Sequence, residues 1–212
     1  MKHRVVFLVC CLAVLAVVPS QLFADQFCTD LPPYQYHPCG TIAAWNVFTV
    51  NQLGASSGVS IDFRDYHANF VDSVQARVFR NGQVVFTSAI SPSNENFPPY
   101  SSFPLIPPIQ FQLQVGDEVE LVFVVADVNG PRSYYSREAD KGLNIDGANH
   151  TWATTLPSQG WCNPKGLNTP CIFVGFEDLS IQEGGDFDYN DFAAWLYGVD
   201  FTTQLDDPTS DR

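Results

Sequence analysis

The chain has 212 residues, and its 10 Lys and Arg stand against 23 Asp and Glu, which gives a formal net charge of −13. A surface this negative repels phosphate groups, so the composition argues against nucleic-acid binding and against binding to anionic membrane surfaces. The same charge attracts cations, and a divalent cation is therefore the first partner to consider.

The N-terminus has the three-part pattern of a secretory signal peptide over residues 1–24. A short basic start precedes an unbroken apolar run over residues 5–18, and polar residues then lead to a cleavage site after Ala24. The apolar run of 14 residues is shorter than the ~20 that a membrane-spanning helix needs. We therefore expect a secreted protein, extracellular or periplasmic, with no membrane span once the signal is removed.

Short segments of alternating apolar and polar residues, separated by turns rich in Gly and Pro, follow along the rest of the chain. Such alternation predicts half-buried strands. Asn81-Gly82 predicts a hairpin, because both central positions of a type I′ turn favour positive φ, and Gly116-Asp117 predicts a second one. Residues 91–108 predict a long surface connection or a sheet edge. The expected strands are residues 59–63, 74–80, 83–87, 111–115, 119–125, 149–155, 171–176 and 192–201.

The fold class follows from these elements. No segment shows sustained helical periodicity, and frequent short strands with Gly and Pro turns are typical of all-β domains. We expect a single antiparallel β-sandwich or jelly-roll-like domain over residues 25–203, followed by a disordered acidic tail at 204–212.

Four cysteines remain after the predicted signal: Cys28, Cys39, Cys162 and Cys171. An even number in an exported protein favours disulfides. Of the three possible pairings we favour Cys28 with Cys39 and Cys162 with Cys171, because each pair brackets a loop that contains proline. The wide spacings do not match the close cysteine pairs of structural zinc sites.

Acidic residues concentrate between residues 177 and 191, where six carboxylates occur without a Lys or Arg. Two like charges about 4 Å apart repel by about 4 kcal/mol at an effective dielectric near 20. A few such pairs rival the roughly 5–15 kcal/mol net stability of a domain. The segment therefore either extends into solvent or folds around a cation, and the apolar strands that flank it favour the cation. The six are Glu177, Asp178, Glu183, Asp186, Asp188 and Asp191.

The spacing within this segment indicates calcium. Asp186-x-Asp188-x-Asn190 places short oxygen-bearing side chains at alternate positions, and Ca²⁺ takes six to eight such hard oxygen ligands, whereas Mg²⁺ keeps its waters. Gly184-Gly185 gives the freedom that a tight loop needs, and Phe187 and Tyr189 should point away and anchor the loop to the core. The loop is not an EF-hand, because helices do not flank it. The expected metal ligands are Glu177, Asp178, Asp186, Asp188, Asn190 and Asp191.

Two motifs stand close together near the acidic segment: Gly-Phe-Glu-Asp at 175–178 and Asp-x-Asp-aromatic-Asn-Asp at 186–191, with Asp-Gly-x-x-His upstream at 146–150. This pattern resembles that of a family of bacterial domains of unknown function found toward the C-terminus of secreted or surface proteins, and the upstream motif is similar as well. The resemblance covers residues 142–197. It implies a β-rich fold and invariant acids, for which calcium binding and an enzymatic role have both been considered. The chain differs from the family in Ala193-Ala194, where β-branched residues are usual, and in lacking a C-terminal sorting helix.

The leading hypothesis is an exported calcium-binding module with a structural or adhesion-type role and an extracellular glycan or protein as partner. Glycan binding by exposed aromatic side chains is the main alternative. A hydrolase that pairs Glu177 with Asp186 or Asp188 is a further one. The aromatic candidates are Trp45, Tyr134, Tyr135, Trp152, Trp161 and Trp195.

Two isolated motifs carry less weight. Residues 54–58 match G-x-S-x-G, but a predicted strand follows at once, so we expect a loop there and not the nucleophile elbow of a serine hydrolase. His150 fits a packed strand histidine, and whether it joins the acidic site with Asp146 stays open at this point.

Overall fold

The computed structural model describes residues 42–65, 70–96, 98, 101–127, 130–154, 171–185, 187 and 189–203. The predicted signal peptide and the predicted disordered tail lie outside these residues, as do Cys28, Cys39 and Cys162. Cys171 is disulfide-bonded, while the pairing of the four cysteines stays a prediction.

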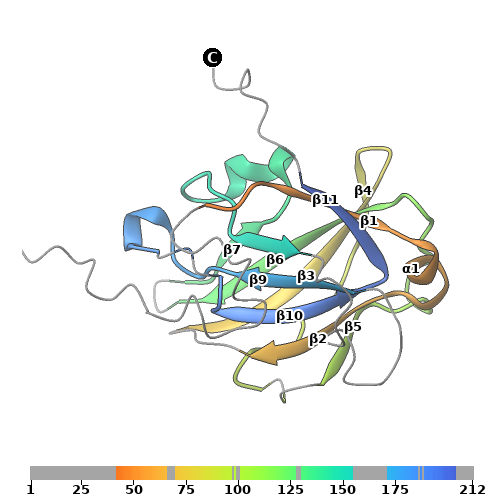
Figure 1. The fold of residues 1–212 in the computed structure, drawn as a ribbon, viewed down its shortest axis with the longest axis horizontal. Helices are drawn as coiled ribbons and strands as arrows, with labels where there is room; N and C mark the ends of the chain where they lie inside the picture. Colours follow the sequence, from red (N-terminus) through yellow and green to blue (C-terminus); the bar gives the residue numbers. More distant parts are fainter. Residues whose placement is uncertain are drawn as a thin grey trace, which may run out of the picture.

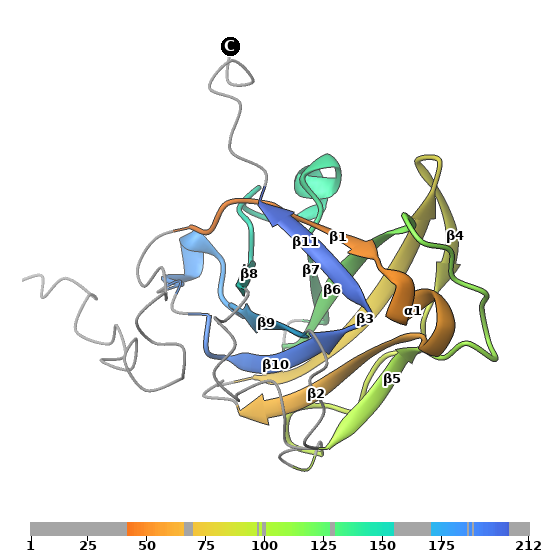
Figure 2. The same ribbon diagram turned by 45° about the vertical axis from the view of Figure 1, so that its right-hand side comes forward.

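Two antiparallel sheets face each other (Figures 1 and 2). The first sheet has the order β11-β1-β6-β3-β4, with β7 also paired to β6. The second has the order β5-β2-β10-β9-β8. The first sheet contains β1 (Asn46–Val50), β3 (Val71–Arg80), β4 (Gln83–Thr87), β6 (Glu118–Ala126), β7 (Arg132–Tyr135) and β11 (Val199–Thr203). The second contains β2 (Val59–Asp65), β5 (Ser102–Ile106), β8 (Thr151–Thr154), β9 (Cys171–Phe176) and β10 (Phe192–Tyr197).

Alternate side chains of both sheets fill the space between them. Along β3, the buried residues Val74, Ala76 and Val78 face the interior, and the residues between them are partly exposed. Phe123 of β6 stacks on Phe176 of β9 with ring centroids 4.7 Å apart, which joins the two sheets directly. The predicted all-β, sandwich-like single domain is confirmed.

The first predicted hairpin is confirmed, and the second is wrong. Asn81 and Gly82 have φ angles of 52° and 74° and connect β3 to β4. Residues 111–115 form no strand, although β6 forms as expected. The reason is that β6 pairs with β3 along one edge and with β1 and β7 along the other, so no edge is left for them.

The G-x-S-x-G segment is a short helix, α1 (Gln52–Ser57), where we expected a loop. The Asn51 side chain accepts a hydrogen bond from the Gly54 N–H, which caps the first turn, and Gly58 with φ 86° ends the helix. Ser56 donates to the carbonyls of its own helix. A strand follows this helix, whereas a nucleophile elbow needs a strand before its serine and a helix after it.

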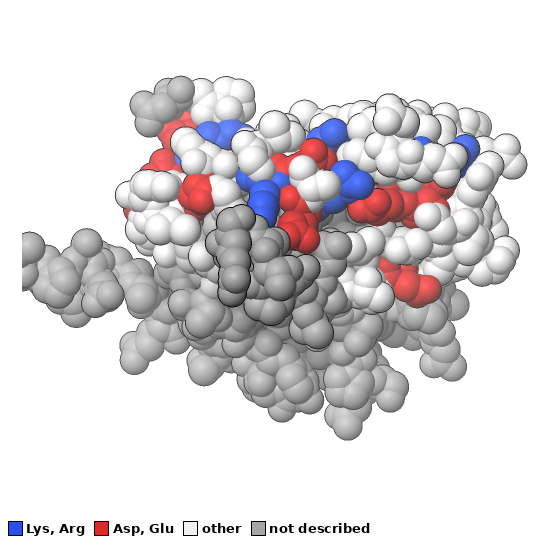
Figure 3. All heavy atoms as spheres, turned by 90° about the horizontal axis from the view of Figure 1, so that it is seen from above, with Lys and Arg blue, Asp and Glu red and all other residues white. Residues whose placement is uncertain are grey.

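The outer face of the first sheet is rich in ion pairs (Figure 3). Arg137 donates two hydrogen bonds to Glu118, at 2.7 and 3.3 Å, and Arg80 pairs with Asp117 at 2.7 Å. Beneath them Glu120 is 1% exposed, with Arg77 2.9 Å from one of its oxygens. Burial, together with the neighbouring Asp140 carboxyl, raises the pKa of Glu120 to about 8 against the lowering effect of Arg77.

The raised pKa of Glu120 predicts how the stability of the protein depends on pH. The folded protein holds the Glu120 proton more tightly than the unfolded chain, where the pKa lies near 4.5. The stability that this group contributes is therefore full below pH 4.5 and is lost as the pH rises towards 8. Glu120→Gln removes that loss, so the variant should be more stable than the wild type at pH 8 by on the order of 1–3 kcal/mol. Urea denaturation at pH 5, 6, 7 and 8 measures the free energy of unfolding of the wild type and the variant. Parallel pH profiles of that free energy for the two proteins would contradict the prediction.

Candidate metal site

Three carboxylates meet at one end of the sandwich, where β9 ends and β10 begins. Glu177 and Asp178 follow β9 directly, and Asp191 precedes β10. One ligand oxygen from each lies within 4.8 Å of the others. Glu177 and Asp178 are 1% and 2% exposed, and Asp191 is partly buried.

The separation of the three carboxylate oxygens fits a single metal ion. Because a Ca²⁺–oxygen distance is about 2.3–2.6 Å, two oxygens on the same ion lie at most about 5 Å apart. Of the six expected ligands, the structure brings Glu177, Asp178 and Asp191 together. Asn190 is buried next to Asp191 in the chain. The remaining two, Asp186 and Asp188, lie outside the described residues.

Backbone N–H groups hold two of these carboxylates in place. The Asp178 N–H donates to Asp191 Oδ2 at 2.7 Å, and the Leu179 N–H donates to Glu177 Oε1 at 3.3 Å. The local chain path therefore keeps the acids close together and oriented.

Two glycines allow this path. Gly184 adopts φ 88° at the end of the short 3₁₀ helix η4 (Ile181–Glu183). A Cβ on Gly185 would lie 2.6 Å from the Leu179 carbonyl oxygen and 3.2 Å from Glu177 Oε1. A side chain at residue 185 would thus push against the acidic cluster itself.

Glu183 does not join the cluster. Its Oε2 accepts hydrogen bonds from the Ser180 N–H and hydroxyl, at 3.1 and 2.6 Å, and forms an ion pair with Arg132. Arg132 also pairs with Asp127 at 3.1 Å. The described ion pairs of Arg132 are thus with two acids outside the triad.

The aromatic residues of the segment anchor it, as predicted. Phe187 and Tyr189 are buried in a second hydrophobic cluster with Trp152, Phe173 and other residues on β8, β9 and β10. The Tyr189 hydroxyl donates to the Asn149 carbonyl at 3.2 Å and accepts from the Ala43 N–H at 2.6 Å. Phe187 and Tyr189 have positive φ angles, 51° and 58°, which are unfavourable for residues with a side chain. Packing of the two rings offsets that backbone cost.

His150 and Asp146 join the site through its backbone. A carbonyl oxygen can only accept, so His150 Nδ1–H donates to the Glu177 carbonyl, at 3.0 Å. Its Nε2 lies 3.1 Å from both Asp146 oxygens, and Asp146 Oδ2 accepts from the Ile181 N–H at 2.9 Å. His150 is fully buried, and its ring stacks on that of Tyr134 with ring centroids 3.7 Å apart. The pair thus holds the start of the acidic segment at two points, and burial lowers the pKa of His150.

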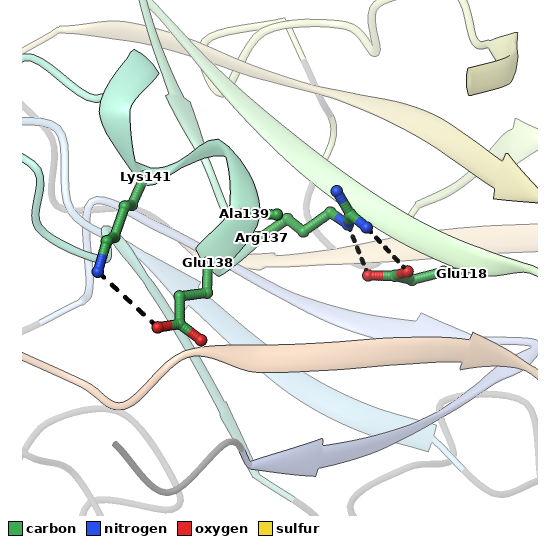
Figure 4. Close-up of a pocket in the computed structure, with 5 residues that line it drawn as sticks. All are labelled: Glu118, Arg137, Glu138, Ala139 and Lys141. Carbon is green, nitrogen blue, oxygen red and sulfur yellow. Dashed lines mark hydrogen bonds and ion pairs between the residues drawn. The ribbon is translucent and has the colours of Figure 1, made fainter. Parts of the chain in front are cut away.

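The alternatives find less support among the described residues. A surface pocket of about 380 Å³ is lined by Glu118, Arg137 and residues of the 3₁₀ helix η3 (Glu138–Leu143). The triad residues do not line it, and its charged groups pair with one another (Figure 4). Trp45, Trp152 and Trp195 are all buried, so these three do not form the exposed aromatic row that glycan stacking needs. Trp161 lies outside the described residues.

Tyr189→Phe tests how strongly the loop is anchored. The variant leaves the Ala43 N–H and the Asn149 carbonyl without their hydroxyl partner, which should lower the free energy of unfolding by about 1–3 kcal/mol in EDTA. Tyr134→Phe is the matched control, because its buried hydroxyl has no hydrogen-bond partner among the described residues. Its stability should stay within about 0.5 kcal/mol of the wild type or rise. Equal losses in the two variants would contradict the anchoring role.

No helix among the described residues is both long enough and apolar enough to cross a lipid bilayer. Comparisons of the chain with protein-family models, with curated proteins and with solved structures find no match. The assignment of the site therefore depends on the chain's own geometry: an all-β fold whose acidic triad could hold a metal ion.

Proposed function

We propose that this protein is an exported calcium-binding β-sandwich module, in which one Ca²⁺ orders the acidic segment at residues 177–191 and stabilises the fold. The observation that carries the proposal is the acidic triad. Three carboxylates with ligand oxygens within 4.8 Å of one another, two of them almost fully buried, form a negative centre. A divalent cation neutralises such a centre.

The donor chemistry favours calcium over other metals. All three side chains offer hard oxygens, and neither a histidine ring nitrogen nor a thiol belongs to the group. Ca²⁺ tolerates irregular shells of six to eight oxygens, whereas Mg²⁺ demands a near-ideal octahedron and retains water. In our proposal Asp186, Asp188 and Asn190 complete the shell around the triad.

A structural role fits an exported protein. Extracellular calcium modules commonly bind with Kd values of about 10⁻⁴–10⁻³ M. An ion of that affinity stabilises the native state without acting as a cytosolic switch. The sequence pattern of a signal peptide, the expected disulfides and the resemblance to secreted bacterial domains support this location and a structural or adhesion-type role, with an extracellular glycan or protein as the partner.

Calcium should raise the melting temperature, and Asp178→Asn should abolish most of that rise. For a Kd of about 10⁻⁴ M, 10 mM Ca²⁺ adds about 2.7 kcal/mol to the stability of the native state. For a domain of this size that corresponds to a rise in Tm of ~5–10 °C. Differential scanning calorimetry in EDTA and in Ca²⁺ measures the rise.

Glu138→Gln is the control, because Glu138 is an acid of η3 outside the triad, and this variant should keep the full calcium response. Mg²⁺ at the same concentration should give a smaller shift. A wild-type protein that melts at the same temperature in EDTA and in 10 mM Ca²⁺ would refute the proposed function.

A further inference from the structure

Asp72 is a buried carboxylate that the first sheet directs into the sandwich. It lies near the start of β3, in the same alternation as the core residues Val74, Ala76 and Val78, and it is fully buried. One of its oxygens, Oδ2, accepts a hydrogen bond from Asn94 Nδ2 at 3.2 Å. The other, Oδ1, has no hydrogen-bond partner among the described residues.

This carboxylate and the acidic triad occupy the same end of the sandwich. Val74, two residues after Asp72 on β3, pairs with Phe123 of β6, and the Phe123 ring stacks on Phe176, the last residue of β9 before Glu177, with ring centroids 4.7 Å apart. The electrostatics agree, because burial and then the negative charge of Asp178 raise the pKa of Asp72 to about 8. Asp72 and Asp178 therefore approach each other from opposite sheets.

Asp72 forms no ion pair among the described residues. Arg132 lies close enough to lower the pKa of Asp72, but the described ion pairs of Arg132 are with Asp127 and Glu183. Glu120, the buried acid on the outer face of the same sheet, differs because Arg77 lies 2.9 Å from it. A buried carboxylate oxygen without a partner indicates a missing ion or water.

A second polar group points to the same place. The hydroxyl of Tyr134, on β7, is buried without a hydrogen-bond partner among the described residues. Burial raises the pKa of Tyr134, Arg132 lowers it, and the charges of Glu183, Asp146 and Asp178 raise it by smaller amounts. Two unpartnered polar groups of the first sheet thus lie near the acids that follow β9 in the second.

We propose that Asp72 is a further ligand of the bound cation, so that one ion joins the two sheets of the sandwich. This inference rests on the proposed calcium function and extends its ligand set beyond the acidic segment. Oδ1 binds the ion, and Asn94 holds Oδ2. Asn94 is itself fixed, because its Oδ1 accepts from the Asp72 N–H at 3.0 Å and its Nδ2 donates to the Phe70 carbonyl at 3.0 Å. Such partners orient metal-binding carboxylates.

Asp72→Asn tests the inference, with Glu120→Gln as the matched control. Both variants replace a buried carboxyl group of the first sheet by an amide of nearly the same shape, but Asp72 lies in the inward register of β3, whereas Glu120 pairs with Arg77 on the outer face. Isothermal titration with Ca²⁺ should show at least a tenfold weaker Kd for Asp72→Asn, since even indirect partners of a metal contribute ~10–100-fold. Glu120→Gln should bind within twofold of the wild type.

The outcomes separate this inference from the proposed function. A wild-type protein without a calcium-binding signal overturns both. A wild type that binds Ca²⁺ and an Asp72→Asn variant that binds it equally well overturn only the role of Asp72. Crystals of the wild type with Tb³⁺ give a measurement that does not depend on the variant folding. The anomalous peak should lie within ~2.6 Å of Asp72 Oδ1, and a peak that contacts only residues of the acidic segment would overturn the inference.

Discussion

Three carboxylates gathered at one end of the sandwich, two of them almost fully buried, are the constraint on which that end depends. The described ion pairs of Arg132 are with Asp127 and Glu183, and the arginines of the outer face pair with Glu118, Glu120 and Asp117. The triad lies between the apolar strands β9 and β10, where the lower dielectric strengthens the repulsion between its carboxylates. A bound cation converts this repulsion into attraction, and it does so for every carboxylate at the centre at once.

Side-chain packing and unfavourable backbone conformations hold these acids together. Phe187 and Tyr189 occupy left-handed conformations that cost free energy, and their rings are buried against the outer side of the second sheet. His150 and Asp146 fix the Glu177 carbonyl and the Ile181 N–H. The apolar residues and the histidine therefore preorganise the acidic segment, which lowers the ordering cost that a metal ion must offset when it binds.

The elements that the sequence predicts well are those whose pattern is local. The β3–β4 hairpin follows from Asn81-Gly82, and the anchoring role of Phe187 and Tyr189 follows from their alternation with polar residues. β1, β7 and the absence of a strand at residues 111–115 depend on which edges of β6 are occupied, and that competition between distant segments leaves no local pattern. The helix α1 was missed because a single capped turn is too short for helical periodicity to show.

The same distinction applies to the site. Glu177, Asp178 and Asp191 could be found from the density of acids along the chain. Asp72 could not, because it stands 105 residues before Glu177 and looks like an ordinary polar position of an alternating strand. In the structure, its burial and its unpartnered oxygen identify it. The signal that could have found it is its phase, since Asp72 occupies the inward register of Val74, Ala76 and Val78, where a carboxylate is unexpected.

The position of the acidic segment in the topology explains how a local ion affects the whole fold. The chain that leaves this segment forms β10, which pairs with β2 and β9 in the middle of the second sheet, and then β11, which pairs with β1 at the edge of the first. Both sheets are thus completed by residues that follow the acids. Any order that an ion imposes at residues 177–191 fixes the start of β10 against the end of β9 and favours the pairing of both late strands. The proposed ligand Asp72 on β3 would add a direct tie between the sheets at the same end.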